Sequence, residues 1–243
     1  RALDRPEYVI DADAERSAVG VVAAPNASFF RQPLAPILTA VGVTVLVVMA
    51  ISFARTNGLV AALWGAGGLA LAVWLRGGRG MAYDFGFGAL VVTGVLAGEF
   101  LVGNGPALSA MFTAMNLLEI ALAVALTRRF VPGLNVNSVD ALARFLTVCA
   151  ASALPSALLS ALALEAMVGA DVLDVFRMWW FGHSLGFAVI GVFGLALRSR
   201  HMSILRQPAR LAEGLAISAL IGVACYTIFS HMSLPYGFLL LPL

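Results

Sequence analysis

Eight hydrophobic segments within 243 residues constrain this chain more than any other feature. Most of them reach the roughly 20 apolar residues that a helix needs to cross a hydrocarbon layer about 30 Å thick. Inside lipid every backbone N–H and C=O must be paired within the protein, so single segments of this length are helices. The sequence therefore predicts an all-α integral membrane protein, an eight-helix transmembrane bundle. The predicted segments are residues 34–54, 57–76, 81–102, 106–127, 139–168, 172–197, 209–230 and 234 onward.

Arginine supplies all 15 basic residues, and its placement predicts the orientation. Only Arg55 and Arg177 fall on one side of the predicted bundle. The positive-inside rule places the richer side in the cytoplasm, so both termini are expected to be cytoplasmic. We therefore expect a multi-pass protein of the inner (cytoplasmic) membrane, with the lipid bilayer as its first partner. The richer side holds Arg1, Arg5, Arg16, Arg31, Arg76, Arg79, Arg128, Arg129, Arg144, Arg198, Arg200, Arg206 and Arg210.

Two regions follow from this pattern. Residues 1–33 form a polar cytoplasmic arm, and residues 34–243 form one multi-span membrane domain. The arm mixes acids and arginines with little periodicity, so we expect it to be disordered alone and ordered only by docking on the cytoplasmic face or a partner. The last segment ends after about ten residues, which is too short to cross a bilayer. We expect that span to continue past Leu243, with a re-entrant segment as the alternative.

Polar side chains inside the spans are the candidates for function, because each costs roughly 3 kcal/mol to insert at mid-membrane. Asn116 and Glu119 are three residues apart, so they share one helix face and must point into the bundle. His183 lies about ten residues into the sixth predicted span, roughly 15 Å deep. Together with Glu99, near the outer end of the third span, Glu119 and His183 could line one cavity in the outer half of the bundle. The residues expected around its mouth are Glu165, Asp171, Asp174 and Arg177.

A structural role is the alternative for each of these residues. Glu119 could be a protonated acid that bonds a neighbouring helix, His183 a satisfied core histidine, and Glu99 an interfacial acid. Trp179 and Trp180 could belong to an interfacial aromatic belt or to the site. The candidate ligand-binding or signalling residues are Glu99, Asn116, Glu119, Trp179, Trp180 and His183. We interpret a further set as packing and kinking features: Gly65, Gly67, Gly68, Gly94, Gly98, Gly182, Gly186 and Pro155.

The histidine and cysteine content argues against most cofactors. A b-type haem in a helix bundle commonly uses two facing histidines, but His183 is the only histidine deep in a span. We therefore predict no haem and no other cofactor, although a single chlorin ligated by His183 stays compatible with the sequence. Cys149 and Cys225 lie inside spans and are interpreted as small buried residues. The chain contains no HExxH motif, phosphate loop or Ser/His/Asp set, so we expect no catalytic or metal residues, and the dispersed arginines argue against nucleic acid.

Three stretches resemble a known family. Residues 63–79 (LWGAGGLALAVWLRGGR) are similar to a Trp-Pro-x-x-Gly-(Ile/Leu)-Ala-Leu segment, and residues 114–130 (AMNLLEIALAVALTRRF) to an Asn-x-x-Glu helix that ends in paired basic residues. Residues 176–186 (FRMWWFGHSLG) are similar to a Trp-Trp-x-Gly-Asp-x-x-Gly helix. In this order and spacing they resemble the membrane-associated sensor domain of type one, the MASE family. These domains are eight-span input modules ahead of bacterial histidine kinases and diguanylate cyclases.

The chain departs from the family pattern at three places. Gly65 stands where the family has proline, His183 stands where it has aspartate, and Phe193-Gly194 occupy the region of a later proline. Asn116 and Glu119 match. A site built on the family's aspartate would therefore be altered here, in its ligand or in its function.

Two main functions remain after this comparison. The resemblance implies a membrane-embedded sensory input domain that passes a ligand or membrane signal to a cytoplasmic output, and the segment itself is not an enzyme. The alternative is a non-catalytic accessory or scaffold subunit of a larger membrane complex that reuses the sensor fold. A homodimer or a larger membrane complex is compatible with either. A solute transporter is disfavoured, because the spans show no pair of inverted, broken segments.

Overall fold

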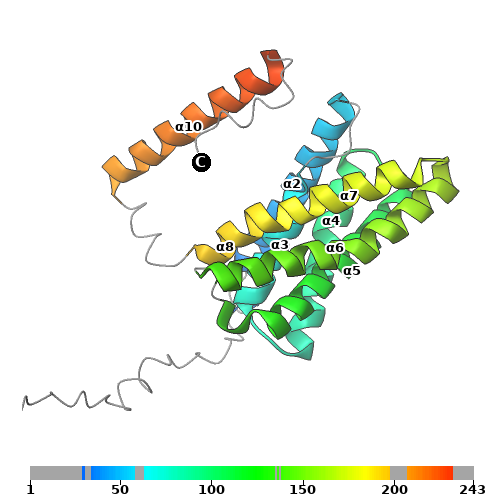
Figure 1. Ribbon diagram of the computed structural model, residues 1–243, viewed down its shortest axis with the longest axis horizontal. Coiled ribbons are helices and arrows are strands. Elements are labelled where there is room, and N and C mark those ends of the chain that lie inside the picture. The colour runs from blue at the N-terminus through cyan, green and yellow to red at the C-terminus, as the bar shows by residue number, and fades with distance from the viewer. Residues whose placement is uncertain are drawn as a thin grey trace, which may run out of the picture. The chain divides into compact units, whose positions relative to one another are not determined.

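The computed structural model describes residues 29–30, 34–57, 63–134, 136, 138–197 and 207–231, and every regular element in these ranges is a helix (Figure 1). Nearly all of the predicted N-terminal arm and the predicted eighth segment lie outside the described residues. The chain divides into two units, one up to Ala196 and one from Leu197 onward, which are described separately. The elements of the first unit are α2 Leu34–Asn57, α3 Gly65–Gly77, α4 Met81–Leu101, α5 Pro106–Phe130, η1 Pro132–Leu134, α6 Val139–Val168, α7 Val172–Gly186, η2 Phe187–Gly191 and α8 Val192–Ala196.

Five stretches in the described part are long and apolar enough to cross a membrane. They confirm the first, third, fourth, fifth and sixth predicted segments, and the last of them runs through α7, η2 and α8 without a break. The seventh predicted segment is occupied by α10, Pro208–His231, in the second unit. The total of eight spans stays a prediction.

The second predicted segment was wrong in its extent. We expected a span from residue 57, but α3 begins at Gly65 and has 13 residues. At 1.5 Å per residue it is about 20 Å long and cannot cross a 30 Å core alone. The chain enters this helix with the backbone N–H of Trp64 donating to the carbonyl of Gly182 at 3.0 Å, so the start of α3 is fixed by a neighbouring helix.

Helix ends in the first unit carry the signals that the residue types predict. Pro106 occupies the first turn of α5, where its missing N–H has no cost. Ser138 and Asp171 cap α6 and α7, accepting from the backbone N–H groups of Ala141 and Asp174. Gly169 ends α6 with a φ of 69°, a conformation that favours glycine. The short turn between α6 and α7 makes these two helices antiparallel neighbours (Figure 1).

The short helix α3 lies at the centre of the first unit. It contacts α2, α4, α5, α7, η2 and α8, and nine of its 13 residues are buried. By contrast few residues of α2 are buried, and large apolar side chains such as Leu34, Leu38 and Met49 are exposed on its surface. Because α3 is enclosed by other helices, its ends need not meet lipid, which is what allows so short a helix at this depth.

Glycines let the helices approach each other closely, as the sequence predicts. A Cβ added to Gly98 would lie 2.6 Å from Val47, at the contact of α4 with α2. The closest approach joins α3 to α7: a Cβ on Gly68 would lie 2.3 Å from the carbonyl oxygen of Gly186, and one on Gly186 would lie 2.0 Å from the carbonyl oxygen of Trp64. Backbone therefore packs directly on backbone at this point.

An ion pair joins the helices at the arginine-rich end of the first unit. Arg128 of α5 donates twice to the carboxylate of Asp84 of α4, at 2.8 and 2.9 Å, and once to the carbonyl of Gly78. The indole of Trp74 donates to the same carboxylate at 2.7 Å. Phe29, from the end of the predicted arm, packs at this end with its ring centroid 6.1 Å from that of Tyr83. These contacts tie α3, α4 and α5 together where the predicted cytoplasmic face begins.

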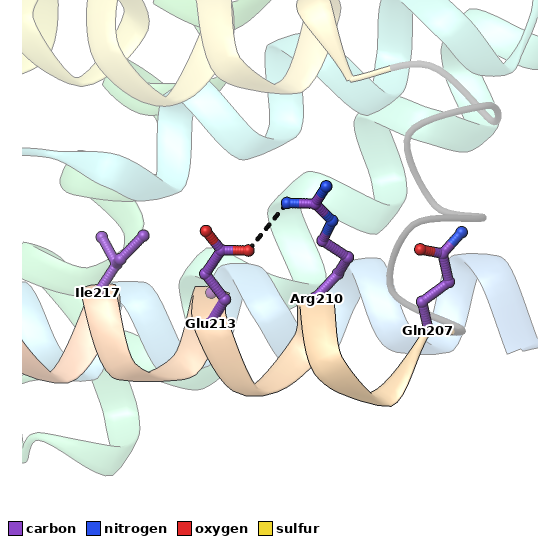
Figure 2. A pocket seen from close by; sticks show the side chains of 5 residues that line it. Gln207, Arg210, Glu213 and Ile217 are labelled. Carbon is purple, nitrogen blue, oxygen red and sulfur yellow. Dashed lines mark hydrogen bonds and ion pairs between the residues drawn. The ribbon is translucent and has the colours of Figure 1, made fainter.

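The second unit contains a surface pocket along α10 (Figure 2). Arg210 and Glu213 form an exposed ion pair there, with 3.0 Å between Nη1 and Oε2. The pocket is lined by Gln207, Arg210, Glu213, Gly214 and Ile217, all from one helix and the residue before it. A pocket built on a single exposed helix face encloses no ligand, so it is not a candidate site.

Candidate functional site

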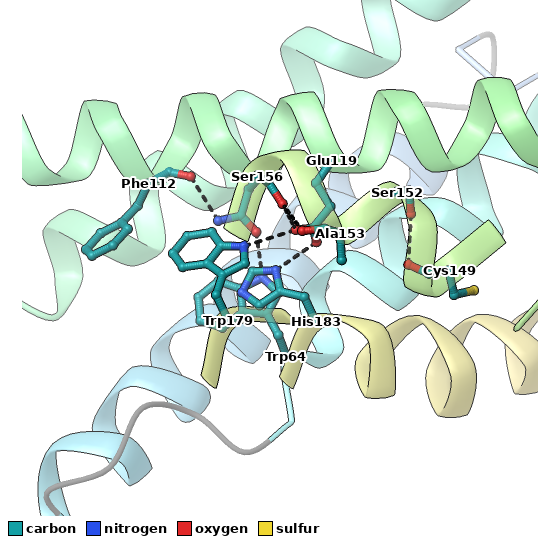
Figure 3. Close-up of polar contacts among 10 residues, drawn as sticks. Trp64, Phe112, Glu119, Cys149, Ser152, Ala153, Ser156, Trp179 and His183 are labelled. Atoms are coloured by element: carbon teal, nitrogen blue, oxygen red, sulfur yellow. Dashed lines mark hydrogen bonds and ion pairs between the residues drawn. The ribbon is translucent and has the colours of Figure 1, made fainter. Parts of the chain in front are cut away.

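Glu119 is the centre of a buried polar cluster (Figure 3). Its side chain lies midway along α5 and is 0% exposed. One carboxylate oxygen lies 2.7 Å from Nδ1 of His183 on α7. The other accepts from the hydroxyl of Ser156 on α6 at 2.6 Å and from the indole N–H of Trp179 on α7 at 3.1 Å. Three helices therefore meet at one carboxylate.

His183 lies between two indole rings. Its ring centroid is 5.1 Å from that of Trp64, with 5° between the planes, and 4.3 Å from that of Trp179, with 18° between the planes. Nδ1 contacts Glu119, whereas Nε2 makes no hydrogen bond to any residue in the described part of the chain. Both faces and one edge of the imidazole are thus held by α3, α5 and α7.

Asn116 extends the cluster toward α3. Its side-chain oxygen accepts from the indole N–H of Trp64 at 2.6 Å, and its amide group donates to the backbone carbonyl of Phe112 at 2.9 Å. Asn116 and Glu119 share one helix face, and both are fully buried. We call the set Trp64, Asn116, Glu119, Ser156, Trp179 and His183 the Glu119 cluster.

Small residues on α6 allow this convergence. Ser152, Ser156 and Ser160 are four residues apart, so they form one stripe, and all three are 0% exposed. Their short side chains bring α6 close to α5, which puts the Ser156 hydroxyl within reach of Glu119. Trp64 is set in place by the contact of Gly68 with Gly186 described above.

The arrangement is suited to holding a proton. A carboxylate and an imidazole at 2.7 Å can share one proton, and neutral donors on the second carboxylate oxygen stabilise a negative charge there. His183 is 4% exposed, so bulk water does not screen the pair. Among the described residues no group of three or more His, Cys, Asp or Glu side chains could hold a metal ion.

Two of the predicted site residues lie outside the cluster. Trp180 donates its indole N–H to the backbone carbonyl of Ala150 at 2.9 Å and so holds α7 to α6. Glu99 is buried in the last turn of α4, where its carboxylate accepts from the side chain of Asn104. The residues expected around a cavity mouth, Glu165, Asp171, Asp174 and Arg177, are exposed near the α6–α7 turn. The cavity itself stays a prediction.

Sequence reasoning missed two members of the cluster, Trp64 and Ser156. Trp64 lies in the first stretch of the family resemblance, at the tryptophan of its motif, so a signal for it was present. Ser156 belongs to a serine repeat of period four in the fifth predicted segment, which marks a helix face that avoids lipid.

Comparison with family models identifies a family for this chain. The MASE1 family model matches residues 33–243, which is most of the chain. No curated protein matches the chain. No solved structure matches it either.

Proposed function

The chain belongs to the MASE1 family of membrane-associated sensor domains of signalling proteins, and on that premise we propose that the Glu119 cluster is its sensing site. A ligand or a change in the membrane would alter the Glu119–His183 pair and shift the bundle between two arrangements. The shift would reach a cytoplasmic output joined after the last span. In this proposal the domain is an input module in a bacterial inner membrane, and catalysis belongs to the output.

The convergence of four helices on one acid–base pair carries this proposal. Glu119 comes from α5, Ser156 from α6 and His183 from α7, and the ring of Trp64 brings in α3. A change in charge or occupancy at the pair would alter contacts on all four helices at once. A site of this kind can bias two arrangements of a bundle, because its contacts differ between them.

A purely structural role explains the cluster less well. Replacing a buried ion pair by apolar residues of similar volume is often neutral or stabilising, because desolvating two ionisable groups costs about as much as their attraction returns. The packing of α5 against α6 and α7 could therefore be achieved with leucine. His183 stands where the family pattern has aspartate, and it contacts Glu119, so two ionisable side chains meet at this point.

The arginine distribution supports the orientation. Arg76 and Arg128 lie in the last turns of α3 and α5. The exposed acids Asp171 and Asp174 lie at the start of α7, at the opposite end of the bundle. We infer that the first of these ends faces the cytoplasm.

Adjacent tryptophans provide a matched test of the sensing site. Trp179→Phe removes the donor to Glu119 and keeps an aromatic ring, while Trp180→Phe removes a donor to the carbonyl of Ala150. Each variant of the full-length protein loses one hydrogen bond, about 1 kcal/mol. We expect Trp179→Phe to change the signalling output and Trp180→Phe to leave it unchanged. Equal outputs from the two variants, at equal protein levels, would contradict the proposal.

The reading frame after residue 243 tests the alternative. A coiled coil followed by a kinase or cyclase domain would support the sensor, and a stop codon would support an accessory subunit of a larger membrane complex.

A further inference from the structure

Polar side chains lead from the outer end of the bundle, where α4 turns into α5, to Glu119. On α5 they are Ser109, Thr113, Asn116 and Glu119, spaced by four, three and three residues, so they share one face. All four are at least 95% buried. The line rises about 15 Å along the helix axis. A buried face lined with polar groups at every turn is costly unless the groups are hydrogen-bonded.

The outer part of this line is already connected. The carboxylate of Glu99 accepts from the side chain of Asn104, and the backbone carbonyl of Asn104 accepts from the hydroxyl of Ser109 at 3.3 Å. Asn104 is only half-buried, so this end reaches the surface. The inner part is connected as well, because the carboxylate of Glu119 accepts from the hydroxyl of Ser156 at 2.6 Å and lies 2.7 Å from Nδ1 of His183.

Between these two parts the hydroxyls lack partners. Thr113 Oγ1 and Ser160 Oγ are buried and make no hydrogen bond with any residue that the structure describes. Thr113 lies between Ser109 and Asn116 on α5, and Ser160 lies one turn outward from Ser156 on the antiparallel helix α6. Unpaired buried hydroxyls are uncommon, and ordered water is a usual explanation.

We propose that water bridges Thr113 and Ser160 and completes a proton path from the outer surface to the Glu119 cluster. The inference rests on the proposed function and names the ligand of that site: a proton taken up from the outer side. A hydronium ion outside gives its proton to the first group of the path, and each water or hydroxyl breaks one O–H bond as it forms another. The Glu119–His183 pair, which holds one proton in its neutral state, then holds two and gains one positive charge.

His183 is the one titratable partner of Glu119 among the described contacts of the cluster. Ser156 from α6 and Trp64 from α3 are uncharged, as is Trp179 from α7. On α4, which also packs against α5, Asp84 is held by Arg128 at the other end and Glu99 lies at the entrance of the path. Uptake of a proton would therefore change the charge of this pair without a second charge beside it.

Infrared spectroscopy of the full-length protein in lipid vesicles tests the path. The carboxyl band of Glu119, assigned by its loss in Glu119→Gln, should respond to a pH step on the side of the α6–α7 turn. Thr113→Val and Ser160→Ala keep the shape and remove one hydroxyl each, so each should slow the response about tenfold, the effect of one lost hydrogen bond. Thr147→Val removes an exposed hydroxyl of α6 that bonds its own helix at the carbonyl of Ala143 and should leave the rate unchanged.

The outcomes separate the two proposals. Unchanged rates in Thr113→Val, Ser160→Ala and their double variant, or a Glu119 band that never responds to pH, would overturn the proton path. If signalling still depends on Glu119 in that case, the sensing site stands without the path. A slowed response together with a normal output from Glu119→Gln would keep the path and overturn the sensing role.

Discussion

Replacing Glu119 by leucine should destabilise the folded protein by roughly 3–5 kcal/mol. The variant loses three polar contacts, to His183, Ser156 and Trp179, and interhelical hydrogen bonds in membranes average about 0.6 kcal/mol each. It also leaves His183 buried with neither ring nitrogen bonded, which costs about a further 1–3 kcal/mol. Glu119→Gln should lose about 1 kcal/mol or less, since its oxygen can accept from Ser156 and Trp179 while its amide donates to Nδ1 of His183.

A buried thiol supplies the assay. Cys149 is 1% exposed, so a thiol-reactive dye will label it only when the bundle opens. With Cys225 replaced by serine, denaturant titration in detergent micelles gives the free energy of unfolding of each variant from one site. A leucine variant as stable as the wild type would refute the reasoning about the polar contacts. A glutamine variant as unstable as the leucine variant would show that charge, and not hydrogen-bond geometry, holds the site.

Three further predictions follow from other parts of the structure. Gly186→Ala should prevent stable folding, since its Cβ would lie 2.0 Å from a backbone oxygen, whereas Gly105→Ala, with nothing within 4 Å, should unfold at the wild-type denaturant concentration. Asp84→Asn should lower the free energy of unfolding by about 2 kcal/mol, because one of the two oxygens that accept from Arg128 becomes an amide N–H2 group facing a guanidinium donor, and the thiol assay measures this. A reporter fused after Arg200 should be active only as a cytoplasmic fusion and one at Asp174 only as a periplasmic fusion; the reverse pattern would contradict the orientation.

Five of the eight spans that hydropathy predicted are found in the described part of the chain, because lipid imposes length and composition on any helix that crosses it. Hydropathy failed for α3, since residues 58–75 are apolar throughout while the helix begins only at Gly65. The start is set by the bond from Trp64 to Gly182, a contact between segments more than 100 positions apart. The π-helix Phe187–Gly191 could not be predicted from the sequence either, because the contact of Gly68 with α7 joins segments that are far apart in the chain. The amino-acid composition of a helix indicates that it lies in lipid, but it does not indicate which helices pack against it.

The site residues that could be predicted are those whose side chains cost free energy to insert into lipid. Asn116, Glu119 and His183 stood out because each is polar at mid-span, and the structure brings all three together. Trp64 was harder to recognise. Inserting a tryptophan into lipid carries no large free-energy cost, so its presence in a span does not by itself indicate a role. Trp179 and Trp180 were indistinguishable in sequence, since adjacent residues of a helix point about 100° apart and only the packing of α7 decides which one meets Glu119.

From the unequal helix lengths of the first unit we expect the domain to respond to bilayer thickness. The 30 residues of α6 extend about 45 Å, well beyond a hydrocarbon core of about 30 Å, whereas α3 is less than half as long. A long helix in a thinner bilayer tilts, and each ångström of mismatch costs a fraction of a kcal/mol. Tilting α6 would move Ser156 relative to α3, which is enclosed by other helices and does not span. Acyl-chain length is therefore a variable to control in any measurement on this protein.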